Sequence, residues 1–451
     1  MDSSKSFDRA LVFFGIMGAL VALLAVIMVL TRDETAAGAD AGETTAASTL
    51  SYELTEFAIL GPQEVKPGPV TLQVHNGGSA THNLVIDGGV RTADLSADEM
   101  ATLDAGVLSE GTYTIFCSIA GHREAGMEMS LTVSTNAADA VAPGDEEEVS
   151  AGEMNQIMID SMLAFPAETE GMGNQPLEPV AIKADGTKVF ELTAEVIQWE
   201  VEPSKFVDAW AYNGQVPGPW IRVDVGDMLE INVTNLTPLG TDVHWHGIST
   251  PNNMDGVSPF TQDPILTGET FTYAFEAEEP AIGMYHAHLH SQISVPNGMF
   301  GPIMIGETPI PYGQTISGVE IPDDLEIAQE IPMVLNDAGV IGLSLNGKSF
   351  PATEPYVASE RDWLVYHYYN EGLLTHPMHQ HQFPQLVFAK DGHPLDVPYW
   401  ADTINVAPGE RYSVLVHADR VGTWVWHCHI LTHVESHDGM FGMVTALIVQ
   451  E

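Results

Sequence analysis

Residues 427–433 read HCHILTH, and this stretch guides the interpretation of the whole chain. Successive side chains of a β-strand point to opposite faces, so His427 and His429 face one way and Cys428 faces the other. Cys428 with His433 can hold one metal ion, while the histidine pair can hold another on the opposite face. By strand geometry the two metals would lie roughly 12 Å apart. This arrangement suits electron transfer between metals, for which a structural zinc site has no use.

The composition limits the classes of partner. A chain of 451 residues has room for about three domains. Its 62 acidic and 15 basic side chains give a net charge of −47, which argues against a nucleic-acid-binding surface. The charge suits high salt, cationic partners or metal-ion substrates, and it suits general solubility equally well. Only two cysteines occur, Cys117 and Cys428, each within its own metal motif, so we expect no disulfide.

The amino terminus has the pattern of a membrane anchor. Residues 10–30 form an uncharged apolar run that is long enough to span a bilayer. Lys5 and Arg9 precede it and acidic sequence follows, which predicts a cytoplasmic stub and transmembrane helix over residues 1–32. A cleaved signal peptide is the alternative. The anchor places the other domains outside the cytoplasm, at the cell surface or in the periplasm. The small, acidic residues 33–50 are typical of a flexible linker.

The rest of the chain reads as an all-β protein with three sandwich domains in tandem. Residues 51–135 contain short β-rich runs separated by glycine and proline, which indicates an antiparallel sandwich. A linker with one short helix is predicted over 136–177. The same strand-and-turn texture then predicts two further sandwiches, at 178–310 and 320–451, separated by a segment rich in proline and glycine.

The domain at 51–135 carries a compact set of soft metal ligands. His82 lies in THNLVID, and Cys117, His122 and Met127 lie in FCSIAGHREAGM. One thiolate, two imidazoles and one thioether match a mononuclear blue-copper site with a weak axial methionine. Zinc would more usually recruit a second cysteine or a carboxylate. The alternative is a buried free cysteine beside a loop histidine.

Histidines further along the chain fall into four paired clusters. They read HWHG (His244, His246), HAH (His286, His288), HPMHQH (His376, His379, His381) and HCHILTH (His427, His429, His433). Each His-x-His pair places two imidazoles on one face of a strand. Eight such imidazoles can surround three copper ions and leave open positions for dioxygen. His376, Cys428 and His433 remain for a mononuclear copper, with Met440 as the predicted axial ligand.

The linker helix carries a stripe of apolar residues. The stripe follows helical spacing and comprises Met154, Ile157, Met158, Ser161 and Met162. This spacing predicts the packing face of one short helix. A methionine-lined copper relay is the alternative.

At this point the chain resembles the multicopper oxidases, the family of laccases and of ascorbate, ferroxidase and cuprous oxidases. The resemblance covers about 178–451, including VPGPWIRVDVGD, and residues 51–135 separately resemble plastocyanin-like cupredoxins. It implies that the three sandwiches are cupredoxin-like Greek-key domains. It implies type 2 copper on His244 and His379, and type 3 copper on His246, His286, His288, His381, His427 and His429. It implies type 1 copper on His376, Cys428, His433 and Met440. With the amino-terminal site, the chain would hold about five coppers.

The sequence departs from the family pattern at two positions. Six residues, VESHDG, separate His433 from Met440 where the family more often has four, so Met443 is a second axial candidate. Ala287 stands where a type 1 cysteine would stand in the middle domain, which therefore should hold no copper of that type.

Two polar residues beside the clusters receive supporting roles. Asp255 in NNMDGV resembles the family's acidic residue near the type 2 copper, where it would orient bound water or relay protons. The alternative is a turn residue before Gly256. His290 is predicted to form a hydrogen bond next to the ligands and not to bind metal.

The resemblance implies an oxidase in which Asp255 and Cys428 are catalytic. Electrons from a phenol, a metal ion or a redox protein would enter at the type 1 copper and pass through Cys428, and four would reduce dioxygen to water. The first alternative is a copper nitrite reductase, which would keep a type 1 cysteine at the place of Ala287. The second is a copper-storage or electron-carrier protein at the membrane surface, against which the eight clustered histidines argue. The amino-terminal domain is expected to admit electrons from a partner.

The division of the histidine pairs predicts a homotrimer. Two pairs lie in the middle domain and two in the last, so a three-copper cluster needs these domains face to face. With only two core domains and a short connector, a closed ring of three chains can supply the contacts. The alternative is one chain that folds its own two domains together.

Overall fold

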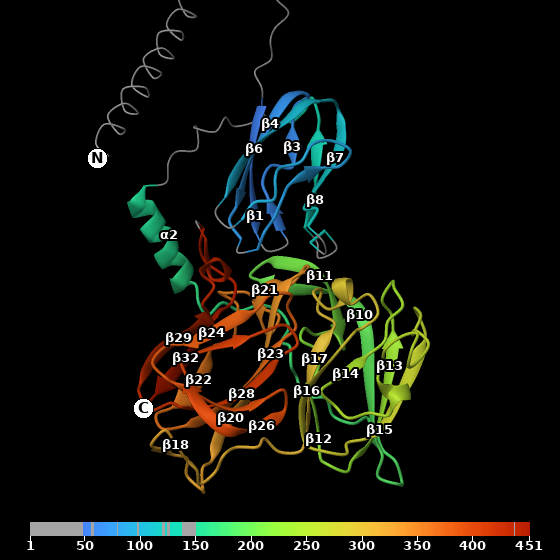
Figure 1. The fold of residues 1–451 in the computed structure, drawn as a ribbon, viewed down its shortest axis with the longest axis vertical. Helices are drawn as coiled ribbons and strands as arrows, with labels where there is room; N and C mark the ends of the chain where they lie inside the picture. Colours follow the sequence, from blue (N-terminus) through green and yellow to red (C-terminus); the bar gives the residue numbers. More distant parts are fainter. Residues whose placement is uncertain are drawn as a thin grey trace, which may run out of the picture. The chain divides into compact units, whose positions relative to one another are not determined.

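The computed structural model describes most of the chain beyond residue 47 (Figure 1). The described residues are 48–55, 58–78, 80–96, 99–119, 122–123, 127–137, 150–436 and 438–451. The predicted membrane anchor at 10–30 lies outside them, as do the first linker up to residue 47 and residues 138–149. None of the helices in this described part is both long and apolar enough to cross a membrane. Strands predominate there, which confirms the prediction of an all-β protein.

The amino-terminal sandwich has two sheets that share one hydrophobic core. The first sheet has the order β2 (Ala58–Leu60), β1 (Ser48–Thr55), β4 (Gly68–Asn76) and β6 (Met100–Leu108). The second has the order β3 (Glu64–Val65), β8 (Glu128–Val133), β7 (Gly111–Phe116) and β5 (Val85–Ile86). Inward residues alternate with outward ones, as in β4, where Leu72 and Val74 are fully buried. They pack with Ile115 and Leu131 of the second sheet.

The middle sandwich places its two histidine pairs on one sheet. That sheet has the order β12 (Ile221–Val223), β17 (Phe300–Ile305), β16 (Ala281–His286) and β14 (His244–His246). The opposite sheet has the order β11 (Lys205–Tyr212), β10 (Lys188–Glu202), β13 (Met228–Asn235) and β15 (Thr270–Glu276), with β9 (Ala181–Ile182) beside β10. β14 and β16 are antiparallel and pair His244 with His286. The register therefore brings two histidine pairs that are distant in sequence side by side.

The last sandwich is larger and has the same layered plan. Its outer sheet has the order β21 (Gly342–Leu345), β20 (Ile327–Ala338), β23 (Trp363–Asn370), β28 (Arg411–His417), β25 (Gln385–Lys390) and β26 (His393–Ala401). The sheet that carries the histidines has the order β22 (Tyr356–Ser359), β32 (Val444–Gln450), β29 (Gly422–Cys428), β24 (His376–Gln380) and β27 (Thr403–Val406). β24 pairs antiparallel with β29 and sets His379 opposite His427.

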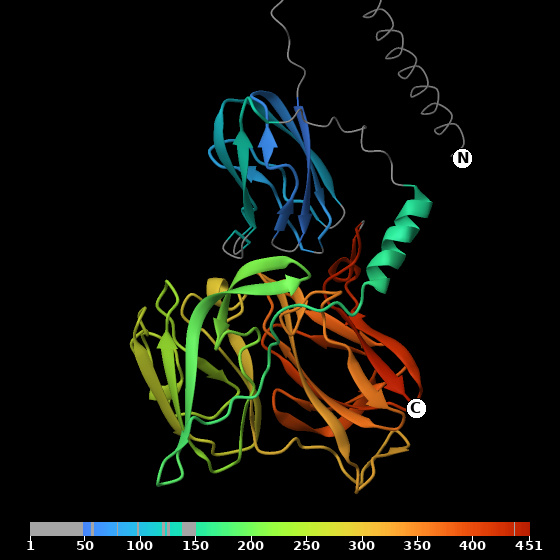
Figure 2. The ribbon, with the colours of Figure 1, turned by 180° about the vertical axis from the view of Figure 1, so that it is seen from behind.

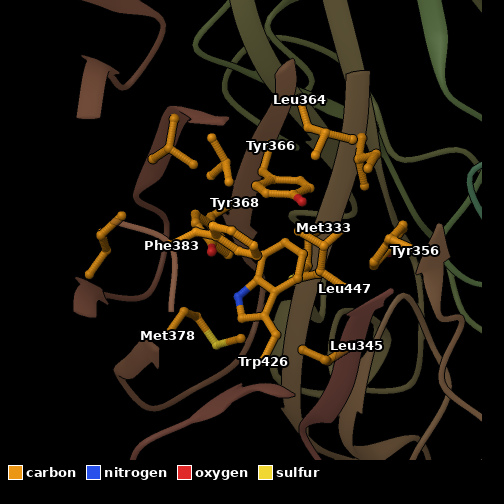
Figure 3. Close-up of a cluster of buried hydrophobic side chains, with 14 of the residues drawn as sticks. Met333, Leu345, Tyr356, Leu364, Tyr366, Tyr368, Met378, Phe383, Trp426 and Leu447 are labelled. Atoms are coloured by element: carbon orange, nitrogen blue, oxygen red, sulfur yellow. The ribbon is translucent and has the colours of Figure 1, made fainter. Parts of the chain in front are cut away.

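Trp426 lies at the centre of the last domain's core (Figure 3). Its ring centroid is 4.3 Å from that of Tyr366 and 5.7 Å from those of Tyr356 and Tyr368. Met378 of β24 borders the same indole in the close-up. Offset and edge-on aromatic pairs of this kind stabilise a core by about 0.5–1.5 kcal/mol each beyond their buried area. This packing fixes β29 immediately before the HCH residues.

Short helices and hairpins complete the described part of the chain. They are α2 (Ala151–Leu163), α3 (Ser291–Ser294), the 3₁₀ turns η1 (Asn252–Met254) and η2 (Leu431–His433), and the two-stranded pairs β18 (Thr315–Ile316) with β19 (Val319–Glu320) and β30 (Glu435–Ser436) with β31 (Gly439–Met440). α2 begins at Ser150, whose hydroxyl accepts a hydrogen bond from Glu153 N while the Glu153 carboxylate accepts one from Ser150 N. This capping box accounts for the start of the helix at that residue.

The middle and last sandwiches pack directly on each other. The Arg411 guanidinium donates to the Ile282 carbonyl at 2.9 Å, and the Trp199 indole donates to the Gly347 carbonyl at 2.7 Å. A shared apolar cluster includes Trp199, Met284 and Tyr369. The ribbon seen from behind shows the two domains side by side, with the segment after α2 crossing them (Figure 2). The two core domains therefore have a fixed interface in a single chain.

Candidate metal centres

The structure gathers His376, Cys428 and His433 into one buried group. The Cys428 Sγ lies 3.7 Å from His376 Nδ1 and 3.6 Å from His433 Nδ1. All three residues are fully buried. Donor atoms around one ion at metal–ligand distances of about 2.0–2.3 Å are separated by roughly 3.5 Å in a trigonal arrangement. The three donors therefore fit a single mononuclear metal ion.

Strand alternation separates this group from the neighbouring histidines. On β29, Trp426 and Cys428 are buried and His427 is half-buried, and His429, which directly follows the strand, is exposed. On β24, His376 is likewise buried while His379 is half-buried. The thiol and the histidine pair of HCH thus face opposite sides of one strand, as the sequence predicts.

Asp337 orients the His376 ring. Its Oδ2 accepts a hydrogen bond from His376 Nε2 at 2.9 Å, which leaves Nδ1 free toward Cys428. The same fully buried carboxylate accepts bonds from the amides of Leu373 and Leu374 at 2.8 and 2.7 Å. Sequence reasoning missed Asp337, because NDAG around it has no recognisable metal-site pattern.

Both candidate axial methionines lie in the loop that follows His433. The amide of Met443 donates to the His433 carbonyl, and the amide of Cys428 donates to the Met443 carbonyl, each at 3.0 Å. Met443 is fully buried, and Met440 is half-buried against the same core. These hydrogen bonds fix the backbone of Met443 and place neither sulfur on a metal, so the choice of Met440 as axial ligand stays a prediction.

The middle domain gathers four histidines at its surface. Ring centroids lie 5.7 Å apart for His244 and His246, 5.5 Å for His244 and His286, and 5.9 Å for His244 and His288. The Nε2 of His286 lies 3.4 Å from Nδ1 of His246. We call His244, His246, His286 and His288 the middle set.

The last domain gathers the other four. We call His379, His381, His427 and His429 the last set. Ring centroids lie 5.0 Å apart for His379 and His381, 5.3 Å for His381 and His427, and 5.6 Å for His379 and His429. The His381 and His427 Nε2 atoms are 3.2 Å apart, and the donor atoms of His379, His381 and His427 all lie within 4.8 Å of one another. Imidazoles this close share a site suited to metal binding.

The contacts of the two sets within one chain are separate. Among the residues that the structure describes, every ring contact or hydrogen bond between these eight imidazoles falls within the middle set or within the last set. The middle set lines a hollow of about 380 Å³ together with Asn370, Glu371 and Gly409, none of which belongs to the last set. Each set is therefore half of the predicted eight-histidine cluster.

Three of these histidines donate a hydrogen bond from Nδ1 to a backbone carbonyl, so their Nε2 atoms carry the lone pair. Nδ1 of His244 donates to the Asp255 carbonyl at 2.8 Å, and that of His379 donates to the Asp402 carbonyl at 2.9 Å. Nδ1 of His427 donates to the Cys428 carbonyl at 2.7 Å. Each of these bonds selects the tautomer whose Nε2 lone pair can bind a metal. The Asp255 carboxylate also lies 3.5 Å from His244 Nδ1, which suits the predicted supporting role of this residue.

Burial favours the neutral form of three metal-site side chains in the copper-free protein. It lowers the pKa of His246 and of His286 to about 4, so both imidazoles are unprotonated at neutral pH. Burial also raises the pKa of the Cys428 thiol to about 12, against a smaller lowering by the backbone hydrogen bond from Ile430. A metal that binds Cys428 at neutral pH must therefore displace its proton.

Glu371 is a buried acid beside the middle set that sequence reasoning missed. It lines the same hollow, and its Oε1 has no hydrogen-bond partner within the described part of the chain. Burial raises its pKa well above the ordinary value, and the opposing effect of Arg411 is smaller. Burial therefore favours the protonated carboxyl, which adds no negative charge to the hollow.

Glu371→Gln is expected to raise the free energy of unfolding of the copper-free protein at pH 7. Because the folded pKa is raised, stability from the neutral carboxyl is complete below the unfolded pKa of about 4.3 and is lost as the pH rises toward the folded value. Glutamine removes this loss, so variant and wild type should converge near pH 4. Urea denaturation at both pH values measures the effect, with the exposed Glu360→Gln as control. A difference that does not change with pH would contradict this account.

The amino-terminal sandwich brings its predicted ligands together as well. The donor atoms of His82, Cys117 and His122 lie within 4.8 Å of one another, and Cys117 Sγ is 3.5 Å from His122 Nδ1. The amide of Met127 donates to the His122 carbonyl at 3.0 Å, and Met127 is fully buried. Asn83, which the sequence did not single out, donates its backbone N–H to Cys117 Sγ at 3.5 Å. This donor set fits a second mononuclear copper site.

Histidines outside these groups have other contacts. His367 is buried between Glu330 and Ser413, at 3.0 and 2.9 Å. His290 begins α3 with φ 57°, and its carbonyl accepts hydrogen bonds from the amides of Ile293 and Ser294. Neither is part of a donor cluster in the described residues.

Comparisons with known proteins agree with this geometry. Two multicopper oxidase family profiles match residues 193–309 and 320–450, together more than half of the chain. A profile for the sulfocyanin (SoxE) domain matches residues 91–142. The match to the SoxE profile covers Cys117, His122 and Met127.

Individual curated relatives match about half of this chain. Laccase-2 of Botryotinia fuckeliana is 33% identical over 253 residues, 48% of this chain and 41% of the relative. Dihydrogeodin oxidase of Aspergillus terreus is 32% identical over 283 residues, 54% of this chain and 44% of the relative. The chain thus spans less than half the length of these curated relatives.

Solved structures of copper oxidases also resemble this chain. The multicopper oxidase mgLAC shares 33% identity with a TM-score of 0.53, over 58% of this chain and 86% of that one. The blue copper oxidase from Nitrosomonas europaea shares 30% identity with a TM-score of 0.52 and the same coverage. The matched domains, the cysteine–histidine group and the two histidine sets lead to one conclusion. This chain belongs to the multicopper oxidase family and carries an additional cupredoxin domain ahead of its two family domains.

Proposed function

We propose that this protein is a laccase-like oxidase that couples one-electron oxidation of a donor to the reduction of dioxygen to water. The observation that carries the proposal is the HCH strand, which places Cys428 in a mononuclear group and its two neighbours in a histidine set. Four electrons and four protons convert one dioxygen to two waters. Bound copper would supply the one-electron redox chemistry and the dioxygen site.

The assignment of the ligands follows the family pattern. His376, Cys428 and His433, with Met440 as axial ligand, form the type 1 site. His244 and His379 bind type 2 copper, and the other six members of the middle and last sets bind the type 3 pair. With His82, Cys117, His122 and Met127 in the amino-terminal domain, the protein holds about five coppers per chain.

Residues of the chain link the two core centres and supply protons. The Cys428 carbonyl accepts a hydrogen bond from His427 Nδ1 at 2.7 Å, so covalent bonds and this contact together connect the thiolate to the last set. Asp255 holds His244 from the outer side of its ring. Glu371 lines the hollow with a raised pKa, so its carboxyl is placed to donate a proton toward the middle set.

Copper analysis and gas exchange test this function. The copper-loaded protein should contain about five coppers per chain and consume dioxygen with one-electron donors. Nitric oxide release from nitrite without dioxygen uptake would instead identify a nitrite reductase, which family membership and the buried Ala287 disfavour. Copper binding without either activity would identify a storage or carrier protein. A donor panel of phenols, cuprous and ferrous ions and small redox proteins would define the substrate.

The amino-terminal cupredoxin is an electron-entry module in this proposal. It holds one mononuclear donor set, and among its described residues none belongs to the middle or the last set. The net charge of −47 favours a cationic electron donor, whose association would slow as salt rises.

Cys117→Ser is expected to remove one thiolate-bound copper and leave oxygen consumption with a small artificial donor within roughly a factor of two of wild type, because the two centres are independent. The measurement is oxygen uptake with a small donor and with candidate protein donors. The rate of the variant should fall below that of wild type only with the protein donors. Loss of turnover with every small donor would place the amino-terminal site on the obligatory path and overturn the entry-module role.

Two features of assembly and location complete the proposal. The protein works as a homotrimer in which the middle set of one chain meets the last set of the next, since one chain does not join its own two sets. Residues 10–30 anchor it in a membrane with its copper domains outside the cytoplasm. Retention in washed membranes, and release by cleavage within 33–47, would test the anchor.

A further inference from the structure

α2 lies against the loop that carries Met440. The helix contacts β31, and both ribbon views draw it beside the hairpin that precedes the carboxyl-terminal strand (Figures 1 and 2). It belongs to the segment before residue 193, outside both multicopper oxidase matches. Its position is therefore a feature of this chain beyond the matched domains.

One serine hydroxyl forms the central contact. The Met440 amide donates to Ser161 Oγ at 2.8 Å, and the Ser161 hydroxyl donates its proton to the Met158 carbonyl at 2.8 Å. The Ser161 hydroxyl thus donates a hydrogen bond within α2 and accepts one from the loop. A half-buried hydrogen bond of this kind has a defined direction and favours one position of the loop backbone.

Gly439 allows the close approach of helix and loop. Its φ is +107°, and a Cβ there would lie 2.5 Å from Ser161 Oγ and 3.2 Å from the Ile157 carbonyl. A side chain at residue 439 would therefore force α2 away from β31. The hydrogen bond to Met440 and the close packing against Gly439 thus both hold α2 against the same part of the loop.

The opposite side of the loop is held by the last domain itself. The amide of Gly442 donates to Ser349 Oγ, and that of Met443 donates to the His433 carbonyl, both at 3.0 Å. Beyond the helix, Phe165 stacks on Phe350 at 5.2 Å between centroids, and the Ala167 amide donates to the Pro351 carbonyl at 2.8 Å. The helix is thus tied to the last domain after its final turn and cannot drift from the loop independently.

We propose that α2 is a positioning element for the type 1 copper, with Ser161 fixing the backbone of Met440 and thereby the strength of the axial thioether contact. The inference rests on the proposed type 1 site. A thioether donor stabilises the cupric state more than the cuprous state, so a weaker axial contact raises the reduction potential. α2 accordingly holds the potential of the electron-entry copper below the value that a free loop would give.

The test uses the full chain with Cys117→Ser, so that the core supplies the only thiolate-bound copper signal. Ser161→Ala should shift the visible absorption and electron paramagnetic resonance of this copper and raise its midpoint potential. Ser161→Thr keeps a hydroxyl and should restore the wild-type values. Gln156→Ala on the exposed face of α2 is the matched control and should change none of them. Gly439→Ala should act in the same direction as Ser161→Ala.

The outcomes separate this proposal from the proposed function. Absence of a thiolate-to-copper band in the Cys117→Ser protein would overturn the type 1 site and the inference with it. If Met440→Leu leaves spectrum and potential unchanged, the axial assignment is wrong and the inference fails. If Met440→Leu shifts both while folded Ser161→Ala and Gly439→Ala match wild type, the site stands and the role of α2 is overturned.

Discussion

Replacing Cys428 with serine is expected to lower donor-driven oxygen consumption by at least about a thousandfold, because residues that act as one catalytic unit fail together. Cys428 Sγ sits between His376 and His433, and its own backbone carbonyl contacts His427. A serine hydroxyl is a poor ligand for soft copper, so both the electron-entry copper and its connection to the last set would be lost. Oxygen-electrode assays with several small donors measure the effect.

The same variant should keep one blue copper. The amino-terminal group of His82, Cys117 and His122 is separate in sequence and has its own thiol, so its visible band should remain. Copper content should fall by about one per chain. Unfolding by urea and circular dichroism would show that the serine variant is folded. Turnover near the wild-type rate in this folded variant would mean that electrons reach the cluster by another route.

The sequence predicted the parts of the site that depend on local strand geometry. His427, Cys428 and His429 alternate as a β-strand requires, and His376 and His379 take the same two faces on β24. This prediction succeeds because the backbone of a β-strand makes successive side chains alternate between two faces, whatever packs around the strand. The resemblance to the multicopper oxidases is confirmed for the same reason, since the family profiles match those local patterns.

Contacts between distant segments were not predictable in this way. Asp337 reaches His376 across 39 residues, and Ser161 reaches Met440 across 279. Such pairs depend on how whole elements pack, and neither aspartate nor serine carries a local pattern that indicates its partner. The linker helix shows the same limit. The spacing of its apolar residues predicts a packing face, yet Met154 and Met162 are exposed. The helix instead contacts the loop of Met440 through the Ser161 hydroxyl.

The exposure of the eight imidazoles helps to decide whether one chain or two neighbouring chains supply the histidines of one copper cluster. His376, Cys428 and His433 are fully buried, whereas in the two sets no histidine is, and His288, His381 and His429 are exposed. The middle and last domains already share a packed interface through Arg411 and Trp199, and no ring contact or hydrogen bond among the described residues joins the two sets. Exposed metal-binding faces without a contact between them in one chain are suited to meeting across chains, as the proposed trimer requires. Closed rings satisfy such head-to-tail contacts without free ends.

Complementation between inactive variants is therefore expected to restore oxygen reduction. One variant carries His244→Ala with His286→Ala, the other His381→Ala with His429→Ala, and each alone should be inactive because it lacks half of one set. In a ring with shared clusters, some sites pair an intact middle set from the second variant with an intact last set from the first. Random mixing of equal amounts gives about one intact cluster in four. Oxygen uptake by purified mixed oligomers should thus recover to about a quarter of the wild-type rate.

The control distinguishes shared clusters from nonspecific rescue. Two variants that are both damaged in the middle set, one at His244 and His286 and the other at His246 and His288, can never form an intact cluster across chains. Their mixed oligomers should stay inactive, although the type 1 copper of each remains blue. If each cluster were instead built within one chain, the first pair of variants would be as inactive as this control. Equal inactivity of both mixtures, in oligomers verified to contain both chains, would exclude the shared-cluster trimer.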